Sequence, residues 1–281
     1  VKKVGVVGCG AMGSGITQLC AQSGYQVVVS EINDELLKKG LASIEKALAR
    51  LVEKSKISQQ DKDVTLGRIK GTTKAKDFSD CDLVIEAAIE NLELKKKIFA
   101  ELDGICPKHA ILGTNTSCLS IIDMAMATKR PEKVLGLHFF NPAPVMKLLE
   151  IVKTIATSNE TIEVSKKFGE SLGKTTVIAQ DAPGFIVNRL WIPFLLHAIR
   201  LYEDGVASRE DIDNAISLGL NYPMGPLALS DMVGIDVVKF VSDALYEQLK
   251  DPRYITPTLV VKMVAAGWLG RKTGKGFYDY K

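Results

Sequence analysis

A histidine and a glutamate twelve positions apart are the residues of this chain best suited to proton transfer. His138 ends the apolar run 134–137, Glu150 lies within the next apolar run, and Pro142 and Pro144 stand between them. Prolines fix the backbone and lack an N–H, so this connection is stiff and cannot pair as a central strand. Such a loop can hold the carboxylate against a ring nitrogen, which sets the imidazole tautomer and stabilises the imidazolium. The pair therefore indicates a general base, with a purely structural pair as the alternative.

A glycine-rich turn near the start of the chain has the spacing of a dinucleotide-binding loop. Gly8, Gly10 and Gly13 follow the β-branched run Lys3–Val7, and a helix is expected over Ser14–Ser23. These glycines permit a tight turn, close approach of the backbone to a pyrophosphate and close packing of helix on strand. The N–H groups at the helix N-terminus can then bind the phosphates.

The acid that ends the next expected strand indicates which dinucleotide is bound. The strand Tyr25–Ser30 closes on Glu31. Its carboxylate would accept hydrogen bonds from a ribose 2′-hydroxyl and would repel a 2′-phosphate, which favours NAD over NADP. A glycine turn that only lets helix and strand pack is the alternative, and the placed acid argues against it.

Two lysine-rich helices are expected where an ordinary dinucleotide fold crosses over more briefly. Apolar residues recur at helical spacing through Asp34–Lys56, and Ser58–Arg68 predicts a second helix that folds back on the first. Arg50 and Lys54 are four residues apart and therefore share one helix face. This face is either an ordinary solvated surface or a clamp for a phosphorylated substrate tail.

Polar residues also follow two expected strands, at the edge where open α/β sheets bind ligands. Glu90 and Lys95 come after the apolar strand Asp82–Glu86, and small residues such as Ala88 would let a cofactor ribose lie close to the sheet. The sequence Thr-Asn-Thr-Ser at 114–117 follows the next expected strand. We expect Glu90 and Lys95 to contact the ribose or pyrophosphate, with a solvated first helical turn as the alternative.

The order of these elements predicts an α/β fold in two parts. Residues 1–183 are expected to form a Rossmann-type, doubly wound and mainly parallel sheet, with the helical hairpin inserted at about 34–68. Residues 184–281 predict a smaller, all-helical domain.

Apolar side chains in the helical part predict self-association. Those around Trp191, Phe194 and Leu195 exceed what a small helical domain needs in its interior. Part of this surface is therefore expected to be a homodimer interface.

Composition excludes several classes of function. The chain has 281 residues and a formal net charge of +3, too balanced for nucleic acid to be its main partner. No apolar run reaches membrane-spanning length, and no signal or transit peptide precedes the strand at Val4, so a cytoplasmic protein without membrane attachment is expected. Five cysteines without a CxxC pair fit reduced thiols. Asp213, with Glu210 and Asp211, reads as a solvated helix start, so no metal centre is expected.

Taken together, these motifs resemble the 3-hydroxyacyl-CoA dehydrogenase family, and its short bacterial members above all. The resemblance covers essentially the whole chain. It rests on GCGAMG with Glu31, AAIENLELK at 87–95, TNTS at 114–117, HFFNPAPVMKLLEIV at 138–152, DAPGFIVNR at 181–189, YPMGP at 222–226 and GRKTGKGFY at 270–278. Many members carry Asp where Glu31 stands, and the two acids are equivalent towards a ribose diol.

The resemblance implies an NAD-dependent oxidation of (S)-3-hydroxyacyl-CoA to 3-ketoacyl-CoA, or the reverse with NADH, with the four-carbon substrate preferred. His138 would take the hydroxyl proton and Glu150 would hold the imidazolium. Ser117 and Asn188 would hydrogen-bond the substrate oxygens, with Asn188 supplied by the helical domain, which would complete the substrate site.

Binding residues follow from the same resemblance. Arg50 and Lys54 match the face that contacts the nucleotide end of CoA, which favours the clamp. The expected NAD site comprises Gly8, Gly10, Ala11, Met12, Gly13, Glu31, Ala88, Glu90, Lys95, Asn115, Ser117, Asn141 and Lys272.

Two other functions stay open. β-Hydroxyacid dehydrogenases also join a dinucleotide domain to a helical one, but they use a lysine-centred site and act on free acids. A non-catalytic, crystallin-like relative would bind NAD as a structural protein. The presence of both His138 and Glu150 weighs against lost catalysis.

Overall fold

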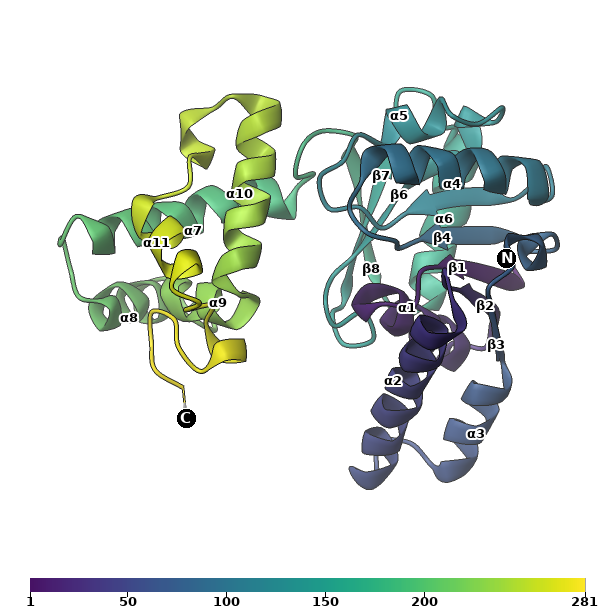
Figure 1. Ribbon diagram of the computed structural model, residues 1–281, viewed down its shortest axis with the longest axis horizontal. Coiled ribbons are helices and arrows are strands. Elements are labelled where there is room, and N and C mark those ends of the chain that lie inside the picture. Colours follow the sequence, from purple (N-terminus) through teal and green to yellow (C-terminus); the bar gives the residue numbers. More distant parts are fainter. Residues whose placement is uncertain (281) are drawn as a thin grey trace. The chain divides into compact units, whose positions relative to one another are not determined.

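Eight strands form one sheet in the order β3-β2-β1-β4-β5-β6-β7-β8 (Figure 1). Their bounds in the computed structural model, which describes residues 1–280, are β1 Lys3–Val7, β2 Gln26–Ser30, β3 Ile69–Thr72, β4 Leu83–Glu86, β5 Ile111–Thr114, β6 Val134–Phe139, β7 Leu148–Lys153 and β8 Thr175–Gln180. Strands β1 to β6 are parallel, β7 is antiparallel to β6, and β8 is parallel to β7. The first six follow the strand order of a doubly wound dinucleotide fold, so the predicted Rossmann-type sheet is confirmed.

Helices pack on this sheet because its β-branched strands are apolar and must be covered. Val4 and Val6 of β1, like Val27 and Val29 of β2, are buried in a core shared with α1, α2 and α6. The helices of this part are α1 Ala11–Gln22, α2 Asp34–Glu53, α3 Gln59–Gly67, α4 Leu92–Ile105, α5 Ile121–Ala125 and α6 Asn159–Ser171, with 3₁₀ turns at Ala75–Phe78 and Pro131–Lys133. The first helix begins at Ala11, three residues before its expected start at Ser14.

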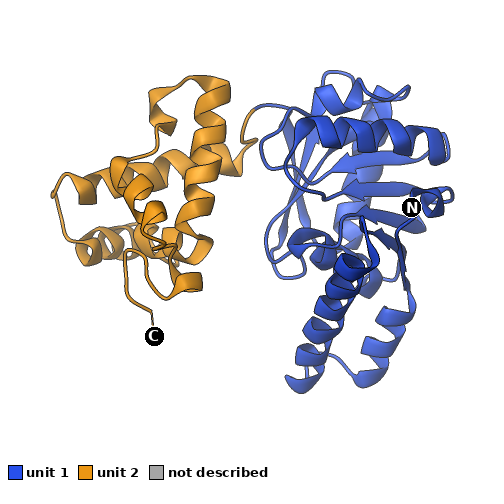
Figure 2. Ribbon diagram, in the orientation of Figure 1, with its two compact units in different colours: residues 1–182 blue, residues 183–281 orange. Residues whose placement is uncertain are grey.

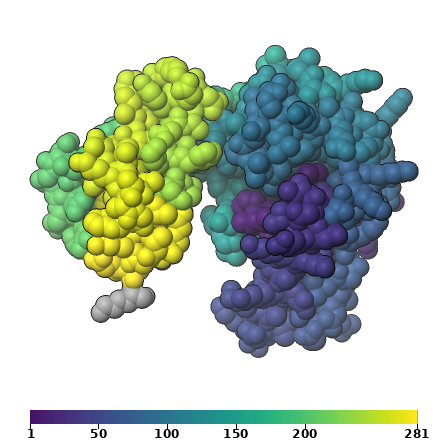
Figure 3. Space-filling model, viewed as in Figure 1, coloured from purple at the N-terminus to yellow at the C-terminus, as the bar shows by residue number. Residues whose placement is uncertain are grey.

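The helices α2 and α3 form the inserted hairpin between β2 and β3, and they project from the sheet at the bottom of Figure 1. The Asn33 side chain caps α2 by accepting from the N–H of Leu36, and Ser58 and Asp61 form a reciprocal capping box at α3. Figure 3 shows the hairpin as the blue lower part of this unit. The start of each helix is thus fixed by local hydrogen bonds, while one face of α2 joins the core.

The chain divides into two compact units, Val1–Ala182 and Pro183–Lys281 (Figure 2). The second unit consists of helices, so the expected helical part is confirmed. They are α7 Val187–Glu203, α8 Arg209–Gly219, α9 Pro226–Val233, α10 Ile235–Leu249 and α11 Thr258–Ala265, with 3₁₀ turns at Pro252–Tyr254 and Arg271–Thr273. None of the helices within residues 1–280 combines the length and apolar character that crossing a bilayer requires.

In the second unit Leu195 is buried, and Trp191 and Phe194 are partly buried against the same core. One expectation for this unit needs correction. Asp213 is also buried, and its carboxylate accepts hydrogen bonds from the N–H groups of Leu227 and Ala228 at the start of α9. It therefore anchors one helix to another and is not part of a solvated helix start.

Candidate active site

The glycine turn between β1 and α1 brings backbone against backbone. A Cβ on Gly13 would lie 1.9 Å from the carbonyl oxygen of Gly8, and Gly8 itself has φ +94°. No larger residue fits either position without a shift of the backbone. Gly10 faces open space and gives α1 no side-chain cap, so the N–H groups of Ala11, Met12 and Gly13 are at an uncapped helix start. This is the arrangement that binds a phosphate.

The carboxylate of Glu31 is hydrogen-bonded to this turn. It accepts hydrogen bonds from the N–H of Cys9 at 2.7 Å and from the N–H of Ile32 at 3.1 Å. A cavity of about 480 Å³, the glycine-loop cavity, is lined by Gly8, Gly10, Glu31 and Ala88 among others. A turn that only glycine can form, an uncapped helix start and a fixed acid beside one cavity fit a dinucleotide.

A buried ion pair lies at the end of β4. The Nζ of Lys95 is 2.6 Å from Oε1 of Glu86, and the two side chains are 1% and 0% exposed. The same ammonium lies 3.3 Å from the carbonyl oxygen of Ala88 and 3.4 Å from Oε2 of Glu90. Thr114 donates its hydroxyl to the other Glu86 oxygen at 2.7 Å. Lys95 is therefore a buried residue with several polar partners, which argues against a solvated first helical turn at this position.

Glu90 connects this ion pair to the polar loop after β5. Its Oε1 accepts hydrogen bonds from the hydroxyl of Thr116 and, at 3.0 Å, from the N–H of Ser117. Asn115, in the same loop, accepts from the N–H of Phe139 at the end of β6. The loop is thus held from both sides. Sequence reasoning missed Glu86 and Thr116, although an acid ending the apolar run Leu-Val-Ile-Glu was a signal for a buried charge.

His138 and Glu150 are direct cross-strand partners in the antiparallel pair of β6 and β7. Nδ1 of His138 lies 2.6 Å from Oε2 of Glu150, and the side chains are 5% and 0% exposed. Because an ionised carboxylate only accepts hydrogen bonds, Nδ1 carries a proton and Nε2 is the nitrogen that can take one. Ser117 Oγ lies 3.3 Å from Nε2. The sheet therefore brings together the expected histidine, glutamate and serine.

The connection between these strands, residues 140–147 or the β6–β7 loop, carries Asn141, whose side chain is exposed. Residues 141–145 form one wall of a second cavity of about 560 Å³, the α1–α2 cavity. Its other walls come from α1 and from α2, including Ala47 and Leu51.

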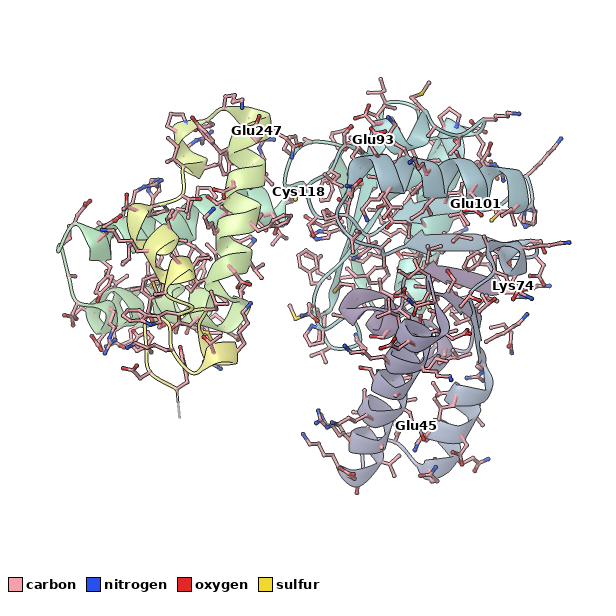
Figure 4. All side chains as sticks on the ribbon, in the orientation of Figure 1. Glu45, Lys74, Glu93, Glu101, Cys118 and Glu247 are labelled. Atoms are coloured by element: carbon pink, nitrogen blue, oxygen red, sulfur yellow. The ribbon has the colours of Figure 1, made fainter. Side chains whose placement is uncertain are left out.

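Arg50 is exposed on the last turn of α2, and Lys54 is the exposed residue that ends it. Within residues 1–280, no carboxylate lies within 4 Å of either side-chain charge. Both belong to the helix that also carries Glu45, labelled in Figure 4.

Two expected residues belong to the second unit. Asn188 lies in the first turn of α7, is 7% exposed, and accepts a hydrogen bond from Nε1 of Trp191 at 2.8 Å. Lys272 lies in a 3₁₀ turn, where its Nζ is 2.5 Å and 2.7 Å from the carboxylate oxygens of Asp236. In the described chain, no three His, Cys, Asp or Glu side chains cluster so as to hold a metal ion.

Known proteins are similar to this chain along its length. Residues 3–182 match the family described as 3-hydroxyacyl-CoA dehydrogenase, NAD binding domain, and residues 184–280 match its C-terminal domain. A 3-hydroxybutyryl-CoA dehydrogenase from Bradyrhizobium diazoefficiens is 46% identical over 281 residues, which cover 100% of this chain and 96% of the relative. One from Mycobacterium tuberculosis is 46% identical, with 100% and 99% covered.

Solved structures are similar as well. The crystal structure of (S)-3-hydroxybutyryl-CoA dehydrogenase PaaH1 from Ralstonia eutropha superimposes with a TM-score of 0.94 at 44% identity. This similarity covers 100% of this chain and 99% of that one.

Proposed function

This chain belongs to the 3-hydroxyacyl-CoA dehydrogenase family and is an NAD-dependent oxidoreductase, and we propose that it interconverts (S)-3-hydroxybutyryl-CoA and acetoacetyl-CoA. The observation that carries the proposal is the buried pair of His138 and Glu150, 2.6 Å apart, with Ser117 beside the second ring nitrogen. The four-carbon preference is supported by the names of the similar proteins.

The proton is moved by His138. In the oxidation, Nε2 takes the proton of the substrate hydroxyl, and the resulting imidazolium is stabilised by Glu150 through Nδ1–H. The hydroxyl of Ser117, which lies beside Nε2, hydrogen-bonds the same substrate oxygen. A bound nicotinamide cofactor would supply the hydride chemistry at C3 in both directions. In the reduction His138 gives the proton back to the ketone oxygen.

The cofactor is held at the glycine-loop cavity. The N–H groups of Ala11, Met12 and Gly13 bind the pyrophosphate, and Glu31 accepts hydrogen bonds from the ribose hydroxyls. The half-buried carboxylate of Glu31, held by two backbone donors, would repel the charge of a 2′-phosphate, which supports NAD over NADP. The remaining proposed NAD contacts are Gly8, Gly10, Ala88, Glu90, Lys95, Asn115, Ser117, Asn141 and Lys272.

The thioester is proposed to bind along the α1–α2 cavity. Arg50 and Lys54, exposed at the end of α2, bind the phosphates of CoA as two charges without carboxylate neighbours among the described residues. The second unit, residues 184–281 in this proposal, contributes Asn188 to the substrate oxygens, and residues 1–183 form the NAD-binding domain.

A homodimer through the second unit is proposed from its exposed apolar side chains. Leu190, Leu218, Leu220 and Phe240 are each more than half exposed, and such patches mark association surfaces. Light scattering of the purified protein should give twice the chain mass. A monomer at micromolar concentration would contradict this part.

A cytoplasmic location is proposed from the thiols. All five cysteines are buried without a disulfide, and burial raises the pKa of Cys20 to about 12 and that of Cys9, next to Glu31, to about 11. Cell fractionation should recover the activity with the cytosol, and recovery from the periplasm or membranes would contradict the proposal.

The decisive assay follows NADH absorbance with acetoacetyl-CoA and, in parallel, with free acetoacetate. We expect NADH to be consumed with the thioester alone. Consumption with the free acid would favour a β-hydroxyacid dehydrogenase. If neither substrate is reduced by a protein that binds NADH, the non-catalytic, crystallin-like function would replace the proposal.

A further inference from the structure

Lys174 is a buried lysine that the mechanism above does not use. It follows α6 and Gly173 and directly precedes β8, and it is 7% exposed. Its Nζ donates to the carbonyl oxygen of Ala143 at 2.6 Å and to that of Met146 at 2.6 Å. Both acceptors belong to the β6–β7 loop. In the part of the chain that the structure describes, no carboxylate lies within 4 Å of this ammonium.

An ammonium in this environment carries a desolvation penalty. Burial lowers the pKa of Lys174, and the neighbouring titratable group is Cys20 of α1, itself buried. A charge held without a counter-ion persists where strong hydrogen bonds offset the loss of water. The hydrogen bonds of the Lys174 ammonium go to two main-chain carbonyls of the β6–β7 loop. Lys174 therefore fixes the backbone conformation of that loop.

The topology explains why residue 174 reaches this loop. Strand β8 is parallel to β7 and pairs Thr175 with Leu148, so the residues before both strands lie together. The N–H of Thr175 donates to the carbonyl oxygen of Lys147 at 2.8 Å. Strand β6 ends beside the start of β7, one residue after His138. Lys174 therefore lies beside the point where the loop enters β7.

The loop it holds is a wall of the substrate region. Residues 141–145 line the α1–α2 cavity. The loop also packs directly on α1, where a Cβ on Gly15 would lie 3.4 Å from atoms of Ala143 and Pro144. Because one face of the loop meets α1 and its carbonyls meet Lys174, the cavity wall is fixed from two sides.

We propose that Lys174 is a positioning residue that holds the β6–β7 loop in the shape required to bind the acyl-CoA substrate along the α1–α2 cavity. This inference rests on the proposed function, because it assigns the cavity to the thioester. Lys174 acts through the loop and touches neither of the reacting atoms in this account.

The kinetic test compares Lys174→Met, Lys174→Arg and the control Lys167→Met, an exposed lysine on α6. Met keeps the length of the side chain and removes its charge and donors, so KM for acetoacetyl-CoA should rise about tenfold or more. The value of kcat should change less than KM. Arg restores the charge and the donors, so the KM of Lys174→Arg should lie close to the wild-type value. The KM of the control Lys167→Met should equal that of the wild type. A lower melting temperature with unchanged KM would overturn the proposal as a merely structural role.

Hydrogen exchange gives a readout that does not depend on catalysis. The N–H groups of Val145 and Met146 donate to the carbonyl oxygen of Pro142 at 2.9 Å and 3.0 Å. They should exchange faster in Lys174→Met than in the control, while α6 is unchanged. Unchanged exchange would overturn the proposal. If Lys174→Met does not fold, Lys174→Gln, shorter and uncharged, should shift KM and exchange in the same direction, and no shift would again overturn it.

Different results would contradict the proposed function and the role of Lys174. If the wild type does not reduce acetoacetyl-CoA, the proposed function fails while the exchange result still reports on the loop. If the wild type is active and the Lys174 variants keep its KM and exchange, only the role of Lys174 fails.

Discussion

Nδ1 of His138 and Oε2 of Glu150 are 2.6 Å apart because their strands, β6 and β7, are antiparallel and pair these two residues. Cross-strand partners of an antiparallel pair project to the same face of the sheet. The register thereby fixes a buried carboxylate against an imidazole at the edge where parallel strands end. The β6–β7 hydrogen-bond ladder therefore holds this geometry, in addition to the stiff loop between the two strands.

Glu150→Gln should therefore impair turnover rather than binding. The amide oxygen can still accept from Nδ1–H, but the charge that stabilises the imidazolium is lost. We expect kcat with acetoacetyl-CoA to fall about 10²- to 10⁴-fold and KM to change little. Glu163→Gln, an exposed change on α6, is the matched control. A Glu150→Gln enzyme with the kcat of this control would refute the role given to Glu150.

Arg50→Ala combined with Lys54→Ala should raise KM for the thioester. Exposed charge contacts contribute up to roughly 1 kcal/mol each, so the loss of two of them can raise KM up to about thirtyfold. The effect should shrink at high salt, which screens exposed charges. Lys39→Ala with Lys129→Ala removes the same charge elsewhere on the surface. The clamp is rejected if the control pair raises KM equally, or if only KM for NADH changes.

Glu86→Gln should destabilise the fold strongly. It removes the buried carboxylate 2.6 Å from the Lys95 ammonium and leaves only the longer contact with Glu90, at 3.4 Å. Breaking a buried ion pair typically costs about 3–5 kcal/mol. The double variant Glu86→Gln with Lys95→Met removes both charges and should recover much of the free energy of unfolding. Glu93→Gln, exposed on α4 and labelled in Figure 4, should stay within about 0.5 kcal/mol of the wild type.

Urea unfolding followed by circular dichroism measures these values. A single variant no less stable than Glu93→Gln would show that the ion pair contributes little. A double variant as unstable as the single one would show that the cost comes from packing rather than from the unpaired charge.

Asp82 should make stability depend on acid pH. Burial alone would raise the pKa of its carboxyl group, but hydrogen bonds from His109 and from the N–H groups of Lys2 and Lys3 outweigh it and lower the pKa to about 2. The folded state therefore binds this proton more weakly than the unfolded state. Ionised Asp82 thus stabilises the fold above the ordinary pKa of 3.8, and this stabilisation is lost as pH falls towards 2.

Asp82→Asn removes this stabilisation by an ionised carboxylate. The urea midpoint of the variant should lie below that of the wild type at pH 5, and the difference between the two midpoints should be smaller at pH 3. A difference that stays constant between these values would show that Asp82 is not titrating as described.

Sequence patterns predicted those parts of the site whose residues lie close together along the chain. The GCGAMG turn and Glu31 lie in one strand-turn-helix-strand unit, so spacing alone placed them at one cavity. The antiparallel direction of β7 could not be read locally, because it depends on pairing with β6 and β8. The stiff loop with Pro142 and Pro144 nevertheless predicted that Glu150 would reach His138.

Burial of charged groups could not be predicted from the sequence, because it depends on which side chains the fold brings together. Lys95 of α4 is interior because its ammonium meets the carboxylate of Glu86 at the end of β4. Asp213 is buried because its carboxylate also accepts the hydroxyl of Tyr278, 65 residues later. From the sequence alone, the acids at 210–213 looked solvated, because the residues that cover Asp213 lie in α9 and near the end of the chain.

The central claim is that His138 is the base of an NAD-dependent acyl-CoA dehydrogenase, and the rate of acetoacetyl-CoA reduction by wild type and His138→Gln tests it most directly. General-base catalysis contributes about 10²- to 10⁴-fold, so kcat should fall by that factor. NADH affinity, measured by fluorescence, should be nearly unchanged because His138 lies outside the glycine-loop cavity. A variant that turns over at close to the wild-type rate would contradict the assignment of the base and, with it, the mechanism.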